Sequence, residues 1–166
     1  MPDITIRPAE KDDYPGIYRL LLQIAGLHAQ WRPDLFRPHP KLTEKDFRRR
    51  LKKSAKQPIL VAISDGRLVG HMFAAITHVK QRSHIKGRCM LYVEDLCVDE
   101  ACRGQGVGRR LMQEADRLAR EHECTLMELN VYSCNESAVA FYTSLGYTPQ
   151  RLGLEKRLPC AEPTAK

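Results

Sequence analysis

The sequence predicts a single mixed α/β domain of the α+β type, in which a mostly antiparallel, twisted sheet of six to seven strands is flanked by about four helices. Three features of the chain predict this fold. Two segments near the N-terminus space their apolar residues at the helical period. β-Favouring runs separated by turn signals follow over residues 59–98, and a strand–loop–helix–strand order covers residues 88–131.

The N-terminal third is predicted to hold one strand and two helices. Residues 4–7 favour a short strand, and residues 12–30 carry an apolar stripe at the helical period. Prolines over residues 31–40 break this helix and predict a loop. Thr43, followed three residues later by Asp46, predicts the start of a helix that runs to about residue 53. The stripe consists of Ile17, Leu20, Leu21, Ile24 and Leu27.

The centre of the chain predicts an antiparallel meander. Residues 59–63 and 68–79 are rich in β-favouring side chains and flank the turn signal of residues 64–67, so they predict a hairpin. A third strand is expected at residues 88–98, after the polar link of residues 80–87.

The C-terminal part predicts a strand–helix–strand unit and one more helix. A helix is expected over residues 107–122 and a strand over residues 126–131. Ser133 with Glu136 fits a capping box for a short helix that ends at Gly146. The chain thus returns to the sheet twice after the central meander.

The length of the chain suits one domain. With 166 residues it can bury about 68–70% of its unfolded surface without disulfide or metal staples. Residues 147–158 are expected to supply the closing strands, so the domain is predicted to cover residues 1–159 and a loose tail residues 160–166.

Nothing in the chain predicts a membrane segment, a secretion signal or a metal site. No apolar run approaches the roughly 18 residues that a membrane helix needs, and residues 1–4 lack the basic and apolar regions of a signal peptide. We therefore expect a cytoplasmic protein. Its six cysteines form no C-x-x-C pair, so they are interpreted as reduced and as no metal ligands.

A net charge of +7 raises the question of a nucleic-acid partner. The densest basic run, residues 45–53, has an ordinary explanation, because Phe47 and Leu51 share one helix face and leave the basic side chains in water. A contribution to binding an anionic coenzyme and a nucleic-acid contact are the two alternatives. The solvated face is favoured, and a nucleic acid is not a favoured partner.

The most informative segment is the glycine-rich run after residue 98. Alternating glycines let several backbone N–H groups converge at the start of a helix, where the positive end of the helix dipole favours a phosphate. Arg103 and Arg109 add full charges on both sides. The segment predicts a site for a phosphorylated ligand, and its residues are Arg103, Gly104, Gln105, Gly106, Val107, Gly108 and Arg109.

Two common phosphate-binding motifs are excluded by spacing. A P-loop needs a Lys-Ser or Lys-Thr pair after its last glycine, whereas Arg109 and Arg110 follow here. A dinucleotide fingerprint needs a G-x-G-x-x-G spacing, which glycines at 104, 106 and 108 do not fit. What remains is an Arg-x-x-Gly-x-Gly cradle for a pyrophosphate.

This cradle and its flanking segments resemble the GNAT superfamily of N-acetyltransferases. Residues 92–98 look like the fourth strand of that family, and residues 130–135 with Phe141, Tyr142 and residues 145–147 look like its fifth strand and fourth helix. The resemblance covers about residues 90–150. It implies the GNAT fold, acetyl-coenzyme A as co-substrate, and direct acetyl transfer to a primary amine within a ternary complex.

The resemblance also implies a general base and a general acid. A lysine-like amine has a pKa of about 10.4, so an enzyme working near neutral pH gains from a base. Glu94 matches the glutamate of the family's strand and Asp95 is the second choice, because neighbouring strand residues face opposite sides unless a bulge intervenes. The alternative is that Glu94 only pairs with an arginine. Tyr142 matches the tyrosine that protonates the coenzyme thiolate, and its alternative is a core residue.

Further residues are expected around the coenzyme by the same resemblance. Backbone groups of the fourth strand would pair with the pantetheine arm, with the Leu96 N–H as an oxyanion donor. Asn135 either caps its helix or contacts that arm. Cys97 is not favoured as a nucleophile, because no histidine motif accompanies it. Besides the cradle, the expected coenzyme contacts are Leu96, Cys97, Val98, Asn130, Asn135, Ala138 and Tyr142.

The acceptor side of the site is predicted least well. The resemblance implies that Trp31, Phe36 and Tyr132 line it together with Glu94, and aromatic rings suit a cation or an apolar group. The expected acceptor is an amine of a small molecule or a peptide, and no role is assigned to the histidines. A coenzyme-binding module without catalysis is the alternative function. Similar proteins often dimerise through their last strands, so residues 152–158 are a possible dimer contact.

Overall fold

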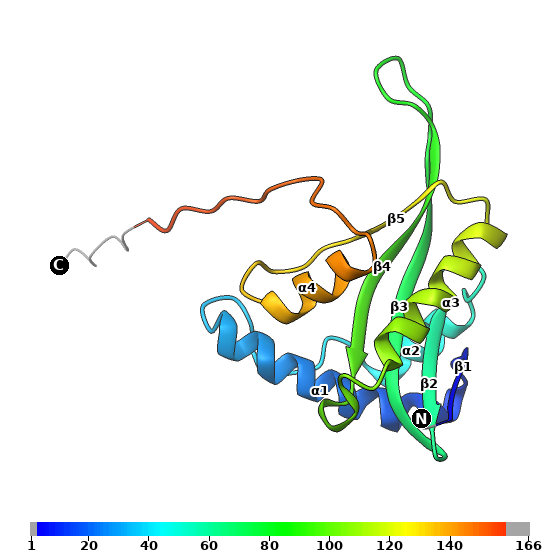
Figure 1. The fold of residues 1–166 in the computed structure, drawn as a ribbon, viewed down its shortest axis with the longest axis vertical. Helices are drawn as coiled ribbons and strands as arrows, with labels where there is room; N and C mark the ends of the chain where they lie inside the picture. Colours follow the sequence, from blue (N-terminus) through cyan, green and yellow to red (C-terminus); the bar gives the residue numbers. More distant parts are fainter. Residues whose placement is uncertain (1–2, 159–166) are drawn as a thin grey trace.

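A computed structural model describes residues 3–158 of the chain. Its helices and strands follow the predicted order, with two short 3-10 turns at Lys11–Asp13 and Glu100–Cys102. The elements are β1 (Ile4–Pro8), α1 (Tyr14–Trp31), α2 (Glu44–Leu51), β2 (Ile59–Ser64), β3 (Arg67–Val79), β4 (Arg88–Val98), α3 (Val107–Glu121), β5 (Leu126–Leu129) and α4 (Glu136–Ser144) (Figure 1).

The sheet has the strand order β1-β2-β3-β4-β5. Each neighbouring pair is antiparallel except β4 and β5, which run parallel because α3 connects them. The meander over residues 59–98 and the strand–helix–strand unit are therefore confirmed. Beyond the body of the sheet, the ends of β3 and β4 extend as a long hairpin arm (Figure 1).

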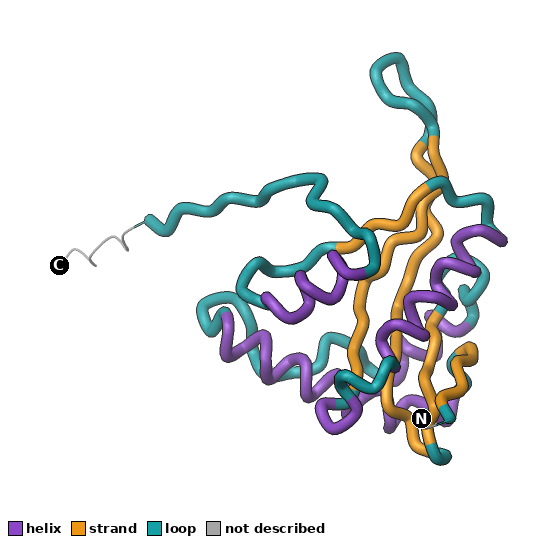
Figure 2. The backbone as a smooth tube through the Cα atoms, in the orientation of Figure 1, coloured by secondary structure: helices purple, strands orange, loops and turns teal. Residues whose placement is uncertain are grey.

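Helices cover both faces of the sheet (Figure 2). Each face has its own apolar core. On one face, α1 and α2 bury Ile17, Leu20 and Phe47 against strand residues such as Val61. On the other face, α3 packs Leu111 and its apolar neighbours, and α4 adds partly buried rings. Alternate residues of β2 point to opposite cores, as the two-residue period of a strand requires.

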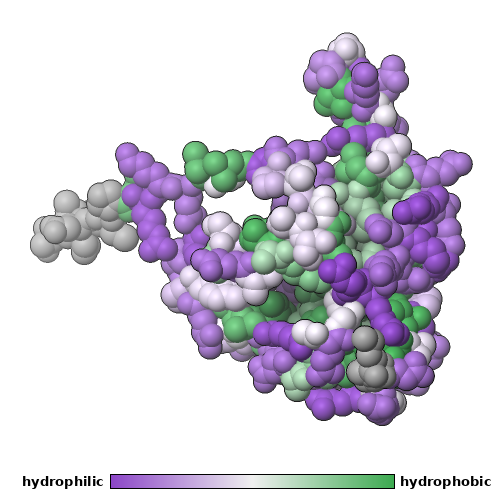
Figure 3. Space-filling model, viewed as in Figure 1, coloured by the Kyte–Doolittle hydropathy of each residue, from purple (hydrophilic) through white to green (hydrophobic). Residues whose placement is uncertain are grey.

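The predicted closing strands are wrong for the part of the chain that the structure describes. The sheet has five strands rather than six to seven, and residues 147–158 form no strand. These residues lead away from the sheet edge as an extended segment that exposes apolar side chains (Figure 3), with Leu152 and Leu154 82% and 87% exposed. A strand needs a hydrogen-bonding neighbour, and this segment has none beside it. The predicted tail, residues 160–166, lies outside the described residues.

The predicted cap of α2 is confirmed, and of the two caps predicted for α4, Asn135 is confirmed and Ser133 is wrong. Thr43 caps α2 by accepting a hydrogen bond from the Asp46 N–H at 3.2 Å. At α4, Asn135 rather than Ser133 is the cap, since its side chain accepts from the Ala138 N–H at 3.2 Å. The reason is chain geometry, because the turn of residues 132–135 places Asn135 directly before the first helical residue.

The basic helix α2 is solvated on one side only. Phe47 is fully buried, and Arg48 and Arg49 pair with acidic residues of their own helix. Arg50 instead turns inward and donates to the Ala74 carbonyl at 2.6 Å. The prediction of a solvated basic face is therefore confirmed for the outer side chains, while Arg50 belongs to the site described next.

Candidate active site

The site lies where the two parallel strands separate. Pairing of β4 with β5 ends at Val93 and Leu129, and β4 then continues to Val98 without a strand on that side. A cleft of about 380 Å³ opens there, between this free edge, α1 and α4. Its lining includes the predicted residues Phe36, Glu94, Asp95, Leu96, Asn130, Tyr132, Asn135, Ala138 and Tyr142.

A β-bulge in β4 brings both acidic residues to this cleft. The register with β3 pairs Asp95 with Phe73 and Val93 with Ala74, which leaves Glu94 as the extra residue. A bulge re-aims the side chains beside it, so neighbouring residues no longer face opposite sides of the sheet. Without a bulge, only one of the two carboxylates was expected to face the cleft. Because the strand is bulged at Glu94, both carboxylates line it.

Each carboxylate has a basic partner from the segment that follows α1. Glu94 Oε2 lies 2.5 Å from Arg50 Nη1, so the alternative of a glutamate–arginine pair is confirmed as a contact. Asp95 Oδ2 lies 2.6 Å from Lys41 Nζ. The side chain of Glu94 is 33% exposed and that of Asp95 only 9%. Glu94 therefore remains open to water, while Asp95 is nearly enclosed.

The environment of Asp95 keeps it ionised. Burial alone would raise the pKa of this carboxyl, but the imidazole of His71 and the ammonium of Lys41 outweigh burial and lower its pKa from 3.8 to about 2. His71 is fully buried, with its Nε2 3.6 Å from Asp95 Oδ1. That distance is long for a hydrogen bond, so Lys41 makes the closer contact. Asp95 is a permanent anion at neutral pH.

Tyr142 enters the cleft from α4. Its burial, reinforced by the negative charge of Asp95, raises its pKa to about 12. The hydroxyl is consequently protonated at neutral pH and can act as a donor. The ring also packs against Phe141 and Tyr147, so both predicted roles of Tyr142, core residue and cleft residue, are present in its surroundings.

Aromatic side chains form one wall of the cleft. The rings of Phe36 and Tyr132 meet edge to face with centroids 5.6 Å apart, and His28 lies 5.1 Å from Phe36. Trp31 was also predicted to line the cleft, but it packs against His28, with ring centroids 5.7 Å apart, and is not among the lining residues. The turn at the end of α1 carries Phe36 inward and leaves Trp31 on the last helical turn.

The glycine-rich run forms the predicted turn into a helix. Gly104 and Gly106 have φ angles of 76° and 86°, which side chains with a Cβ rarely adopt. No side chain caps α3, and its first intrahelical bond runs from the Arg110 N–H to the Gly106 carbonyl. The N–H groups before that bond have no intrahelical acceptor. They are free to bind an anion, so the segment fits the diphosphate of a coenzyme.

The side chains around this cradle leave it open to solvent. Arg103 and Arg109 are exposed, with Arg103 Nε donating to the Val98 carbonyl at 3.3 Å and Arg109 Nη2 near Ser144 Oγ at 3.4 Å. Gln105 donates to the Ala101 carbonyl at 3.0 Å and so braces the turn. Val107 is buried and anchors α3 on the sheet.

Three further predicted coenzyme contacts, Cys97, Asn130 and Asn135, make hydrogen bonds within the protein. Burial raises the pKa of the Cys97 thiol to about 12, and its sulfur faces Leu20 in the core. Its burial and its raised pKa agree with the expectation that Cys97 acts through its backbone only. Asn130 Nδ2 donates to the Tyr92 hydroxyl at 2.9 Å at the rim of the cleft. Asn135 performs its helix-capping role while also lining the cleft.

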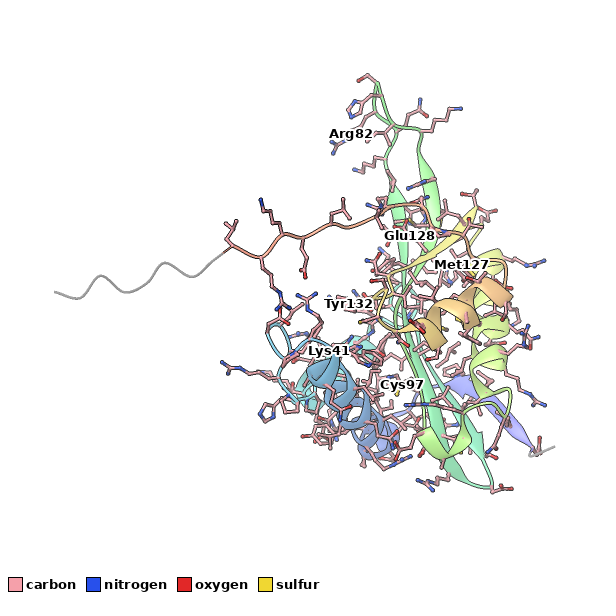
Figure 4. All side chains as sticks on the ribbon, turned by 60° about the vertical axis from the view of Figure 1, so that its left-hand side comes forward. Lys41, Arg82, Cys97, Met127, Glu128 and Tyr132 are labelled. Atoms are coloured by element: carbon pink, nitrogen blue, oxygen red, sulfur yellow. The ribbon has the colours of Figure 1, made fainter. Side chains whose placement is uncertain are left out.

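Lys41, His28 and His71 were missed from the sequence. Lys41 lies in a loop whose path the sequence does not predict. His28 lies on a helix whose apolar residues were interpreted as core, so nothing in the sequence singled it out. His71 had a weak signal, since a histidine interrupts an otherwise apolar strand around Met72 and Phe73. Figure 4 labels Lys41 and Tyr132, which lie near each other in that view and line the same cleft.

Comparison with known proteins agrees with this geometry. The profile of the Acetyltransferase (GNAT) family matches residues 24–147. Glucosamine 6-phosphate N-acetyltransferase 1 of Oryza sativa subsp. japonica is 30% identical over 152 residues, which cover 89% of this chain and 82% of that protein. The L-amino acid N-acetyltransferase AaaT of Escherichia coli is 28% identical over 159 residues, covering 92% and 88%.

Solved structures show the same fold. The structure of a tetramutant of the BH1408 protein from Bacillus halodurans superimposes with a TM-score of 0.89 at 31% identity, covering 93% of this chain and 99% of that one. The chain belongs to the GNAT acetyltransferase family. Membership supports acetyl transfer to an amine, with acetyl-coenzyme A as the co-substrate general to the family. In the described part of the chain, no helix is long and apolar enough to cross a membrane.

Proposed function

We propose that the protein transfers the acetyl group of acetyl-coenzyme A directly to a primary amine bound in the cleft between β4 and β5. The observation that carries this proposal is the bulge at Glu94 in β4, the strand that leads into the anion cradle. Through this bulge both carboxylates face the cleft that Tyr142 of α4 also lines. When bound, the coenzyme supplies an activated acetyl thioester. The chain supplies binding, orientation and proton transfer.

Glu94 is the proposed general base. The acceptor amine must lose its proton before it can act as a nucleophile, and a carboxylate connected to water can accept that proton directly or through a water. Its partner Arg50 fixes the carboxylate at 2.5 Å and leaves it one-third exposed. Asp95, with its low pKa, is a weaker base and better suited to hold an ammonium.

Tyr142 is the proposed general acid. Its raised pKa keeps the hydroxyl protonated until the departing thiolate needs a proton. The free edge of β4 at Leu96 offers backbone groups for the pantetheine arm and for the polarised carbonyl, with Cys97 and Val98 contributing backbone only. No covalent acyl-enzyme is proposed, because the buried Cys97 thiol faces away into the core.

The acceptor side fits an amine with an alkyl or ring portion. Phe36 and Tyr132 offer aromatic surface, and the two carboxylates favour a cation over an acidic acceptor. The relatives named above act on amines of different kinds, a sugar phosphate and amino acids. A thiol-release screen over amines, amino acids, peptides and aminoglycosides would identify the acceptor of this protein.

Calorimetry with acetyl-coenzyme A is the first experiment, and absence of binding would remove the proposal. Turnover is then measured with the best amine of the screen. Glu94→Gln should lower kcat within the range of about 10²–10⁴-fold typical of acid–base groups. Coenzyme binding without thiol release for any amine would instead favour a binding module without catalysis.

A homodimer is a further part of the proposal. The apolar side chains of Leu152, Leu154 and Leu158 are 82%, 87% and 77% exposed in the single chain, and the outer edge of β5 has no strand beside it within the described residues. Pairing of residues 152–158 with a second copy would cover both. Sedimentation analysis of the full chain against Leu152→Ser/Leu154→Ser tests it, because a monomer in both samples contradicts the pairing.

A further inference from the structure

The acceptor cleft already holds a primary ammonium, and it belongs to the protein. Lys41 Nζ lies 2.6 Å from Asp95 Oδ2 in the cleft that Tyr142 and Leu96 also line. Among the cleft-lining residues Lys41 is the one lysine, and Arg37 carries no nucleophilic amine. The chain therefore places its own amine where the proposed reaction needs one.

Asp95 explains why an ammonium must be there. Its side chain is only 9% exposed, and a carboxylate removed from water needs a cationic partner or it becomes costly. Lysine meets this need with a compact point charge on a flexible stem. Arg50 pairs with Glu94. His71 Nε2 stays 3.6 Å from Asp95 Oδ1, so Lys41 makes the closest basic contact with Asp95.

The contact between Lys41 and Asp95 can open easily. The Lys41 side chain is 63% exposed although its Nζ touches a buried group, so little packing holds its stem in place. Lys41 lies between α1 and α2 in a loop without regular structure. An acceptor ammonium can therefore displace Lys41 from Asp95 without disturbing the core.

We propose that Lys41 occupies the position of the acceptor amine and, when no free acceptor is present, receives the acetyl group itself. This inference rests on the proposed function and names its acceptor class, an unhindered primary ammonium on a flexible alkyl chain. The Lys41 ammonium gives one proton to Glu94, and the freed lone pair of Nζ attacks the thioester carbonyl. The C–S bond breaks, the second proton passes from nitrogen to solvent, and Tyr142 protonates the departing thiolate.

The products are an amide at Lys41 and free coenzyme A, and no other reactant is needed. Acetylation removes the positive charge of Lys41, so the modified side chain no longer pairs with Asp95. The buried carboxylate is then left for an external ammonium. Lys41 would thus act as a modification site that changes how the cleft binds its acceptor.

The first measurement needs no coenzyme. Butylammonium chloride is titrated into the wild-type protein, into Lys41→Met, and into Lys45→Met as the matched control, since Lys45 is exposed on the outer side of α2. We expect Lys41→Met to bind butylammonium several-fold more tightly than the other two proteins, and the double variant Lys41→Met/Asp95→Asn to lose that gain. Equal binding by wild type and Lys41→Met overturns the proposal.

The second measurement uses acetyl-coenzyme A alone and peptide mass spectrometry. We expect one acetyl group per chain on Lys41, at a rate independent of protein concentration because the step is intramolecular. Tyr142→Phe should slow it and Lys41→Arg abolish it. Labelling of Lys45, Lys52 and Lys53 at the same rate as Lys41, or no label on Lys41, overturns the proposal. Calorimetric binding of the coenzyme in the same samples separates this failure from failure of the proposed function.

Discussion

The cradle and the cleft are the two halves of the site, and they are built in opposite ways. The cradle is one continuous stretch of chain, residues 103–109, whose backbone conformation forms the proposed binding site for the coenzyme diphosphate. The cleft is assembled from side chains of α1, the α1–α2 loop, β4, the end of β5, the segment after it, and α4. One half depends on glycine geometry and the other on the placement of charges.

This difference separates coenzyme binding, which is common to the family's reactions, from acceptor recognition, which differs between its members. A diphosphate is the same in every reaction of the coenzyme, so a backbone turn with free N–H groups suffices to bind it. The acceptor differs between the relatives, and in the proposed function its recognition rests on side chains such as Lys41, Phe36 and Tyr132. Changes in the cradle should therefore alter coenzyme affinity alone, while changes in the cleft should alter turnover or acceptor binding.

The largest expected effect is that of Tyr142→Phe, which tests the cleft. Loss of the hydroxyl should reduce kcat by about 10²–10⁴-fold while coenzyme affinity stays close to that of the wild type. Tyr147→Phe is the matched control, since that ring packs against Tyr142 and its hydroxyl, among the described residues, bonds the Met127 sulfur alone at 3.8 Å. Stopped-flow or steady-state thiol release measures both. Equal kcat for the two variants would remove the acid role of Tyr142.

An intermediate effect is expected in the pH dependence of stability. Asp95 has a folded pKa of about 2 against an ordinary value of 3.8, so its ionised form stabilises the fold. The stabilisation, on the order of 2 kcal/mol, is complete above about pH 4 and is lost as the pH falls through the folded value.

Urea unfolding of wild type and Asp95→Asn checks this window. The two proteins should differ most near neutral pH, and the difference should shrink between about pH 4 and pH 2. Asp12→Asn is the control, because Asp12 is exposed and makes no contact with the cleft. A difference between wild type and Asp95→Asn that is the same at both ends of this range would contradict the assignment.

The smallest expected effect concerns the cradle. Gly106→Ala forces a side chain into φ 86°, and the left-handed conformation costs about 1–2 kcal/mol for such a residue. An added Cβ would meet no atom within 4 Å, so the cost is conformational rather than steric. Coenzyme affinity measured by calorimetry should fall about 5–30-fold at most, with the KM for the amine unchanged. Gly153→Ala, at an exposed position, should leave both constants unchanged.

Local sequence by itself determined most of the fold and the whole cradle. Apolar periodicity predicted α1 and α3, and turn signals predicted the hairpin of β2 and β3, because these depend on residues close together in the chain. The glycines at 104 and 106 predicted the cradle for the same reason. Glu94, Asp95 and Tyr142 were predicted as site residues through the family resemblance of their flanking segments.

Only the tertiary structure decided how the cleft is assembled. The bulge at Glu94 depends on the register with β3, so the sequence of β4 could not show that both carboxylates face one cleft. Lys41 meets Asp95 from a loop more than fifty residues earlier in the chain, and His71 meets it from the neighbouring strand. The closing strands failed as a prediction for the same physical reason: a strand forms only where another strand lies beside it, and a single chain's sequence does not say which neighbour that is.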